Sequence, residues 1–263
     1  MPEPSNEIGE HPRVRLKADE EPINDSRRSS LTLGEAWRTF LRHHSPWMIG
    51  ATLSGASVAR ALVGDWALAD TLAPLVLIAA FPIIEWVIHV CILHWRPRQI
   101  GRFEIDSLLA RKHREHHADP RDIPLLFIPW QVLTWLLPSY VVLAVFAFPR
   151  PGLGLTFLVA ITALMFAYEW THFLVHSDYR PRTRAFRALW RNHRLHHYKN
   201  EHYWFTVTTA GTADRLFGTF PRVSEVETSP TVRALHAREQ GRQRPGRSRR
   251  TTTGRMPGRV VSR

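Results

Sequence analysis

Ten of the fifteen histidines in this 263-residue chain fall into four short clusters. Neutral imidazole is the commonest side-chain ligand for metals near neutral pH, and residues three or four apart stand on one face of a helix. A His-x2-His-His triplet can therefore direct three rings toward one volume. Two triplets and two pairs offer more nitrogen atoms than one ion can bind, so the spacing predicts a site for two metal ions. The clustered residues are His89, His94, His113, His116, His117, His172, His176, His193, His196 and His197.

The spacing of the first pair carries a structural prediction of its own. A single pair could be a chance repeat on a helix face, but four clusters in order are hard to obtain by chance. His89 and His94 are five positions apart, which in an ideal helix places the two rings well around the cylinder. We therefore expect the helix to end or bulge between them, so that both rings reach the site.

The elements that position these residues are predicted to be membrane helices. Apolar stretches cover about 47–64, 71–95, 124–148 and 152–174, and a spanning helix needs roughly 20 residues. The stretch 47–64 is the weakest, because it is short and contains Arg60. The pattern predicts an all-α, integral membrane protein with about four transmembrane helices and a helical cap that holds the dimetal site.

The two ends of the chain are polar. Residues 1–30 contain few large apolar residues, so we expect a disordered segment there. The segment 222–263 is rich in arginine and lacks aromatic residues; it is predicted to be a disordered basic tail, and no nucleic-acid binding is expected. The membrane-embedded domain is then 31–221. It begins with a short interfacial helix near 32–43, whose start is predicted by the capping-box pattern Thr32-x-x-Glu35.

The charge distribution predicts the orientation in the membrane. Lysine and arginine crowd the segment before the first stretch, the segment 95–123 and the chain after 176, whereas the connections 65–70 and 149–152 hold almost none. By the positive-inside rule, both termini and the segment 95–123 are cytoplasmic. All four histidine clusters then lie on the cytoplasmic side, as a shared site requires.

The ligand types limit the chemistry. Structural zinc sites are usually rich in thiolates, whereas this chain has one cysteine, Cys91, which we interpret as a packing residue. Imidazole suits iron, copper, nickel and zinc, and a hydrolase would need only one zinc-bound water. Two histidine-rich metals at a bilayer fit better with dioxygen binding and attack on an unactivated C–H bond of a lipid. The sequence contains no Gly-x-Ser-x-Gly, P-loop or Gly-x-Gly-x-x-Gly motif.

The order of the clusters resembles the fatty acid hydroxylase/sterol desaturase superfamily of integral-membrane di-iron oxygenases. The resemblance covers about 80–220 and includes the runs 196–200, 204–209 and 214–219, and the last of these blocks is more similar to the fatty acid hydroxylase branch. It implies that the ten histidines bind two iron ions, that dioxygen is the co-substrate, and that a lipid is hydroxylated or desaturated.

The expected function is therefore O2-dependent hydroxylation of a lipid acyl chain. Electrons are expected to come from a separate carrier, a ferredoxin or a haem protein, because the sequence shows no haem domain or flavin motif. A sterol, carotenoid or ether lipid as substrate, or desaturation, remains an alternative. A non-enzymatic metal-binding or transport protein is a further one, although a transporter should hold its ligands near the bilayer midplane.

Several polar residues near the clusters could support the site. Glu85 lies in an apolar stretch, so we expect it to orient a ligand ring through a hydrogen bond. Glu169 forms Glu-x-x-His with His172, the spacing of carboxylate-bridged di-iron bundles, and is a minor candidate for a ligand. Trp204 and Phe205 are predicted either to line a substrate channel or to lie at the membrane interface. Further candidates for hydrogen bonds to the rings, each with an ordinary loop or interface role as the alternative, are Asp119, Asp178, Asp214 and His202.

Overall fold

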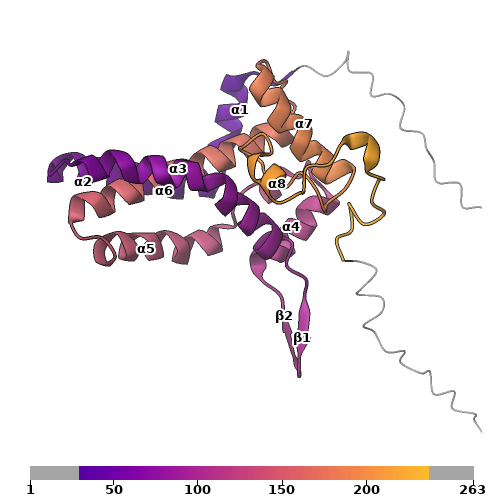
Figure 1. Cartoon of the computed structure of the whole chain (residues 1–263), viewed down its shortest axis with the longest axis horizontal. Helices are drawn as coiled ribbons and strands as arrows, with labels where there is room; N and C mark the ends of the chain where they lie inside the picture. Colours follow the sequence, from indigo (N-terminus) through magenta and orange to yellow (C-terminus); the bar gives the residue numbers. More distant parts are fainter. Residues whose placement is uncertain (1–29, 237–263) are drawn as a thin grey trace, which may run out of the picture. The chain divides into compact units, whose positions relative to one another are not determined.

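The computed structural model describes residues 30–236. The predictions for residues 1–29 and 237–263 lie outside the described residues. The described part is mostly helical, and its elements follow the chain in one order (Figure 1). These elements are α1 (Leu33–Phe40), α2 (His44–Val63), α3 (Leu68–Val87), η1 (Ile88–Leu93), β1 (Arg98–Ile100), β2 (Phe103–Ile105), α4 (Leu108–Ala118), η2 (Ile123–Leu126), α5 (Trp130–Phe146), α6 (Pro151–His176), α7 (Arg184–Tyr198), α8 (Thr212–Leu216) and η3 (Val223–Glu225).

Three helical segments of the described chain are long and apolar enough to cross a membrane: Leu68–Leu93, Ile123–Phe146 and Pro151–His176. The first is 11% buried, so most of its apolar surface faces outward, as a lipid-exposed helix requires. The predicted stretch 47–64 does form a helix, α2, but α2 is not among these three. A fourth span through α2 therefore stays a prediction.

Helix α6 is the central element, and α2, α3 and α5 all pack against it (Figure 1). Its contact with α5 is close at Gly154, where a Cβ atom would lie 1.9 Å from the carbonyl oxygen of Ala144. Glycine is therefore required for the two backbones to approach each other. The apolar core lies on the same helix: Ile49 of α2, Leu133 of α5 and Met165 of α6 belong to one cluster.

The predicted start of the first helix is confirmed. Thr32 is the N-cap of α1, and the amide of Glu35 donates to its Oγ1 at 3.3 Å, while the amide of Thr32 donates to Oε2 of Glu35 at 2.8 Å. This reciprocal pair is a capping box. Phe40 then buries its ring against Phe173 of α6, with 5.7 Å between the ring centroids, so α1 is held on the same helix.

The expected all-α fold is corrected by one short hairpin, which joins η1 to α4. Strands β1 and β2 pair antiparallel, with Arg98 opposite Ile105 and Ile100 opposite Phe103. Gly101 occupies the first of the two turn positions with a φ of 60°, which a type II′ hairpin turn needs and glycine adopts most readily.

Candidate metal centre

The structure brings all ten clustered histidines together where η1, which follows α3, packs against α4 and where α6 packs against α7. They form two groups of five, and within each group one ring nitrogen per residue lies within 4.8 Å of all the others. The first group is His89, His94, His113, His117 and His196, and the second is His116, His172, His176, His193 and His197.

Each His-x2-His-His triplet divides its residues between the two groups. On α4, His113 and His117 join the first group while His116, between them, joins the second. On α7 the reverse holds, and the middle residue His196 crosses to the first group. Residues four apart share a stripe of the helix, whereas the intervening residue faces to one side. Each of these helices therefore supplies histidines to both groups.

The first pair is aligned by a change of helix type. Residues Ile88–Leu93 form a π-helical turn, and the amide of His94 donates to the carbonyl of His89 at 3.0 Å. Five residues on an α-helix would turn the side chains about 140° apart, whereas the wider π turn stacks them on one side. The two ring centroids are 5.0 Å apart. The predicted bulge between these histidines is thus confirmed.

The spacing of the inward nitrogens fits metal coordination. Nε2 of His113 lies 3.1 Å from Nε2 of His89 and 3.2 Å from that of His117, and Nε2 of His196 lies 3.2 Å from those of His117 and His94. Two nitrogens bound to one ion at about 2.1 Å and at right angles would be roughly 3.0 Å apart. Neutral rings whose lone pairs face each other this closely repel, so the arrangement fits rings around a cation.

Backbone carbonyls fix the outer nitrogen of four rings. Nδ1 donates to a carbonyl oxygen at 2.5–3.1 Å in each case, which leaves Nε2 as a lone-pair donor on the inner side. Such outer hydrogen bonds set the tautomer and orientation of metal-binding histidines. The four pairs are His89 with Phe205, His117 with Val232, His172 with Leu126, and His196 with Tyr203.

Val232, whose carbonyl bonds His117, belongs to the segment 222–263 that was predicted to be a disordered tail. The structure describes the tail up to residue 236, and Val226, Val232 and Leu235 are buried. Ser229 and Thr231 both bond the carboxylate of Glu201, at 3.0 and 2.6 Å. Residues 222–236 therefore pack over the first histidine group, and only the remainder of the predicted tail lies outside the described residues.

Other buried nitrogens have no partner within the described chain. Both ring nitrogens of His116 and of His176 are buried without a hydrogen bond, and so is Nε2 of His172. Leaving a buried polar atom unpaired costs about 1–3 kcal/mol. Nδ1 of His193 and Nδ1 of His197 are in the same state, which makes seven such atoms in the second group. Seven are difficult to explain by packing, and the set fits a bound ion.

Burial also keeps the α4 and α7 rings neutral. It lowers the pKa of His113, His116 and His117, and that of His193 and His197, well below the usual value, and the neighbouring rings lower it further. Burial lowers the pKa of His196 to about 4. Neutral imidazole is the metal-binding form, so these rings can bind metal at pH 7 without first losing a proton.

The family comparison agrees with this geometry. The model of the family described as fatty acid hydroxylase matches residues 74–219, more than half of the chain. The chain belongs to the fatty acid hydroxylase family. The matched region runs from α3 to the end of α8 and contains all ten clustered histidines. Among the curated proteins and among the solved structures, no match to this hydroxylase-family chain is found.

The predicted hydrogen bond from the buried Glu85 of α3 to a histidine ring is wrong, because its carboxylate bonds a loop instead. Oε1 of Glu85 accepts from the amides of Val207 and Thr208 at 2.7 and 2.8 Å, and Oε2 accepts from the Thr208 hydroxyl at 2.9 Å. These residues belong to the loop whose Phe205 carbonyl accepts from His89. Glu85 therefore positions the ring through the loop.

Asp214 holds the same loop from the other side. Its carboxylate accepts from the amides of Phe205 and Thr206 at 2.9 and 3.0 Å and from the Thr219 hydroxyl at 2.7 Å. Asp214 was a candidate for a bond to a ligand ring, and it too acts through the loop. Two carboxylates on separate helices, α3 and α8, thus fix one backbone segment.

The remaining candidates lie away from the rings. Glu169 accepts from the Ser45 hydroxyl and from the amide of Ile128. It therefore joins α2 and the segment between η2 and α5 to α6, and it belongs to neither group. Arg121 donates its amide to Asp119 at 3.2 Å and its guanidinium to Asp178. His202 is exposed and pairs with Glu201 at 3.6 Å.

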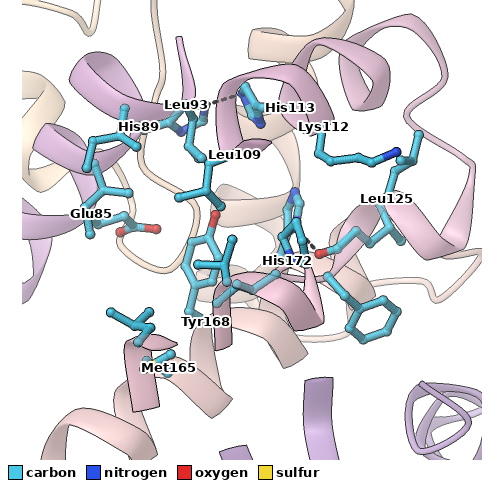
Figure 2. Close-up of a pocket in the computed structure, with 18 of the residues that line it drawn as sticks. Glu85, His89, Leu93, Leu109, Lys112, His113, Leu125, Met165, Tyr168 and His172 are labelled. Atoms are coloured by element: carbon cyan, nitrogen blue, oxygen red, sulfur yellow. Dashed lines mark hydrogen bonds between the residues drawn. The ribbon is translucent and has the colours of Figure 1, made fainter. Parts of the chain in front are cut away.

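A cavity of about 320 Å³ opens beside both histidine groups. Figure 2 shows His89 and His113 on one side of it and His172 with Tyr168 on the other, with Leu109 between the two sides. Most of its wall is apolar side chains from η1, α4, α5 and α6. Trp204 and Phe205 are not part of the wall; the ring of Phe205 packs 5.2–5.4 Å from three first-group rings.

Sequence reasoning missed the carbonyl groups that orient the rings. Leu126, Tyr203 and Val232 are ordinary residues whose side chains give no signal, because their backbone oxygens do the work. Only the Glu85 and Asp214 side chains, which hold the loop next to Tyr203, carried a signal in the sequence.

Proposed function

We propose that this chain is a membrane di-iron oxygenase that hydroxylates an acyl chain of a lipid. The observation that carries the proposal is the cavity, because an apolar space of this kind admits a hydrocarbon chain and its wall includes histidines of both groups. A substrate methylene in this space would lie next to both metal positions. The fatty acid hydroxylase family match supports the same chemistry.

The ten clustered histidines are the proposed ligands, five for each of two iron ions. Iron held there would reduce dioxygen, so that one oxygen atom replaces a C–H bond by C–OH and the other leaves as water, with two electrons and two protons consumed. The carbonyl-bonded rings, such as His89 and His172, keep their Nε2 atoms directed inward. The family uses lipids, and imidazole ligands suit iron.

The protein itself positions the chain and excludes water. The wall is mostly apolar, with residues such as Met165 and Val132, so it offers few hydrogen-bonding groups to water. Lys112 of α4 also lines the cavity and is partly exposed, so a polar headgroup near this residue could remain outside while the hydrocarbon enters. A fixed depth of insertion then selects which carbon meets the metals.

Electrons are proposed to come from a separate ferredoxin or haem carrier. Arg184, Arg187 and Arg191 are exposed and follow each other at three- and four-residue spacing on α7. The same helix carries His193, so an acidic carrier docked on these arginines would approach the metal centre. The concentration of basic residues beside the histidines favours a cytoplasmic position for both the site and the termini.

The test is lipid mass spectrometry under isotopically labelled dioxygen. The full chain is expressed with a ferredoxin and its reductase and compared with His196→Ala and with His202→Ala, which changes an exposed histidine outside both groups. We expect a lipid that gains one labelled oxygen with the wild type and with His202→Ala, and none with His196→Ala. Loss of two hydrogens without label would identify a desaturase, and a labelled sterol, carotenoid or ether lipid would change the substrate class.

The absence of any altered lipid in this assay would also be informative. If the wild type binds two irons per chain, receives electrons and alters no lipid, the hydroxylase proposal is wrong. The non-enzymatic metal-binding function would then stand in its place.

A further inference from the structure

The hairpin β1–β2 has one apolar face and one polar face. Antiparallel partners project to the same side of a two-stranded ribbon, and the side alternates along each strand. The register of the two strands therefore puts Arg98, Ile100, Phe103 and Ile105 on one face and Gln99 with Glu104 on the other. All six residues are exposed.

The apolar face has no covering within the described chain. Ile100, Phe103 and Ile105 are 59%, 63% and 45% exposed, which is unusual for three neighbouring large apolar side chains on a soluble surface. A two-stranded hairpin is only marginally stable in water without a partner for its apolar face. The face therefore favours an apolar partner beyond the described residues.

The location of the hairpin points to the bilayer. The span Leu68–Leu93 ends five residues before β1, so the hairpin begins at the boundary of the hydrocarbon region. In Figure 1 it extends across the direction of α3 and α5 rather than along it. An element that leaves a spanning helix in this direction at its end runs along the membrane surface.

The charges of the hairpin fit lipid headgroups. Arg98 shares the apolar face, with its guanidinium 4.8 Å from the centre of the Trp95 ring. Arg102 occupies the turn, 5.0 Å from the ring of Phe103. Arginine beside exposed aromatic and aliphatic residues is the composition of interfacial segments, in which apolar groups enter the acyl boundary and cations meet phosphates.

Both ends of the hairpin are fixed to α4 by one side chain. Arg114 pairs with Asp106 after β2, and its other nitrogen donates to the carbonyl of Trp95 before β1 at 3.3 Å. The strands also connect η1 to α4, and both of these elements line the cavity. The hairpin is therefore joined directly to two of the elements that form the cavity wall.

We propose that the hairpin β1–β2 binds the surface of an anionic bilayer through Ile100, Phe103 and Ile105, with Arg98 and Arg102 at the phosphates, and thereby holds the cavity at the lipid surface. This interaction goes beyond the proposed oxidation and does not depend on it. A second copy of the chain is the other apolar partner to be tested.

The experiment measures the depth of each hairpin face in a membrane. The full chain, with Cys91→Ser, receives single cysteines at Ile100, Phe103, Gln99 or Glu104, and each is labelled with an environment-sensitive nitrobenzoxadiazole dye. The labelled proteins are placed, one chain per disc, in nanodiscs of phosphatidylcholine and phosphatidylglycerol. Lipids with a nitroxide near the start of the acyl chain quench dyes that enter the bilayer. Each variant is also checked for folding. Two bound irons per chain establish it, and if the protein does not bind iron, an unchanged melting temperature does.

We expect dyes at 100 and 103 to be quenched at least about twofold more than dyes at 99 and 104, with emission shifted to the blue. Replacing phosphatidylglycerol by phosphatidylcholine, or introducing Arg98→Gln with Arg102→Gln, should reduce this difference. Equal quenching at all four positions, whether strong or absent, would overturn the proposal. So would shielding of 100 and 103 that appears only when several chains share a membrane, since that result identifies a second copy. Quenching is measured without turnover. The membrane-binding proposal can therefore fail while the hydroxylase proposal stands, and the hydroxylase proposal can fail while the hairpin still binds the membrane.

Discussion

The two ends of α6 carry buried polar clusters that are built in opposite ways. Near its start, Thr156 donates to Asp70 at 2.7 Å, and Asp70 pairs with both Arg60 and Arg150. Near its end, His172 and His176 face a set of neutral rings whose nitrogens partly lack partners. The first cluster pairs its positive charges with negative ones, whereas the second holds imidazole nitrogens and no opposite charge.

The difference separates a structural cluster from a binding site. Buried charges are tolerated when every one is paired within the protein, and the Arg60 cluster meets this condition with two arginines and the carboxylates of Asp65 and Asp70. Each neutral ring has one N–H and one lone pair, and four of the ten rings give their N–H to backbone carbonyls. The lone pairs of this cluster therefore outnumber the N–H groups left to bond them, which fits a cation from outside. The same helix can hold both, because its two ends face different neighbours.

The largest expected effect on turnover comes from removing a histidine that belongs to a different group from the other histidines of its triplet. His116→Ala takes from the second group the only ligand that α4 gives it. We expect turnover to fall by more than the roughly 10–100-fold that loss of an outer hydrogen-bond partner produces, with fewer than two irons per chain. Labelled-oxygen incorporation and metal analysis measure this, with His202→Ala as the matched control. Full iron content in His116→Ala would show that the division into two groups of five is wrong.

A smaller effect is expected from the loop that Glu85 positions. Glu85→Ala frees the amides of Val207 and Thr208, so the Phe205 carbonyl no longer fixes His89. Iron affinity or turnover should fall about 10–100-fold, and Glu85→Gln, which keeps one oxygen acceptor, should lose less. Competition with a chelator gives the affinity. Equal loss in the two variants would indicate that the negative charge of Glu85, rather than its hydrogen bonds, is what matters.

Removing the metal should loosen one end of α6 and leave the other unchanged. After treatment with a chelator, amide hydrogen exchange in α4 and α7 is expected to accelerate by at least about tenfold, because the rings then face each other without a cation. Exchange near Arg60 and Thr156 should not change, since that cluster holds its own counter-ions. Acceleration at both ends would mean that the two clusters are coupled.

The smallest effect on activity is expected at the paired end. Arg60→Leu removes a buried partner of Asp70 and should lower stability by about 3 kcal/mol, while turnover per folded chain changes by less than about twofold. Thermal melting and the labelled-oxygen assay separate the two quantities, and Arg182→Leu, at an exposed arginine, is the control. A loss of turnover without a loss of stability would give this end a part in the reaction.

Features that depend on neighbouring residues were predictable from the sequence. The capping box at Thr32 and Glu35, the break between His89 and His94, and three of the apolar spans all follow from spacing along the chain. The hairpin was not predicted, although Gly101 followed by a second turn residue between alternating residues was a usable signal. The function of Glu85 was misjudged because its partners are more than one hundred positions away.

The sequence by itself determined which residues form the centre, since histidine spacing places rings on helix faces regardless of what surrounds them. Only the tertiary structure decided how the rings divide, with His116 joining the group of His193 and His197, and His196 joining the group that contains the other two histidines of α4. It also decided that the carbonyl of Val232 fixes His117. The physical reason is that helical periodicity is local, whereas the packing of α4 on η1, the packing of α7 on α6 and the path of the chain after 222 depend on contacts between distant segments.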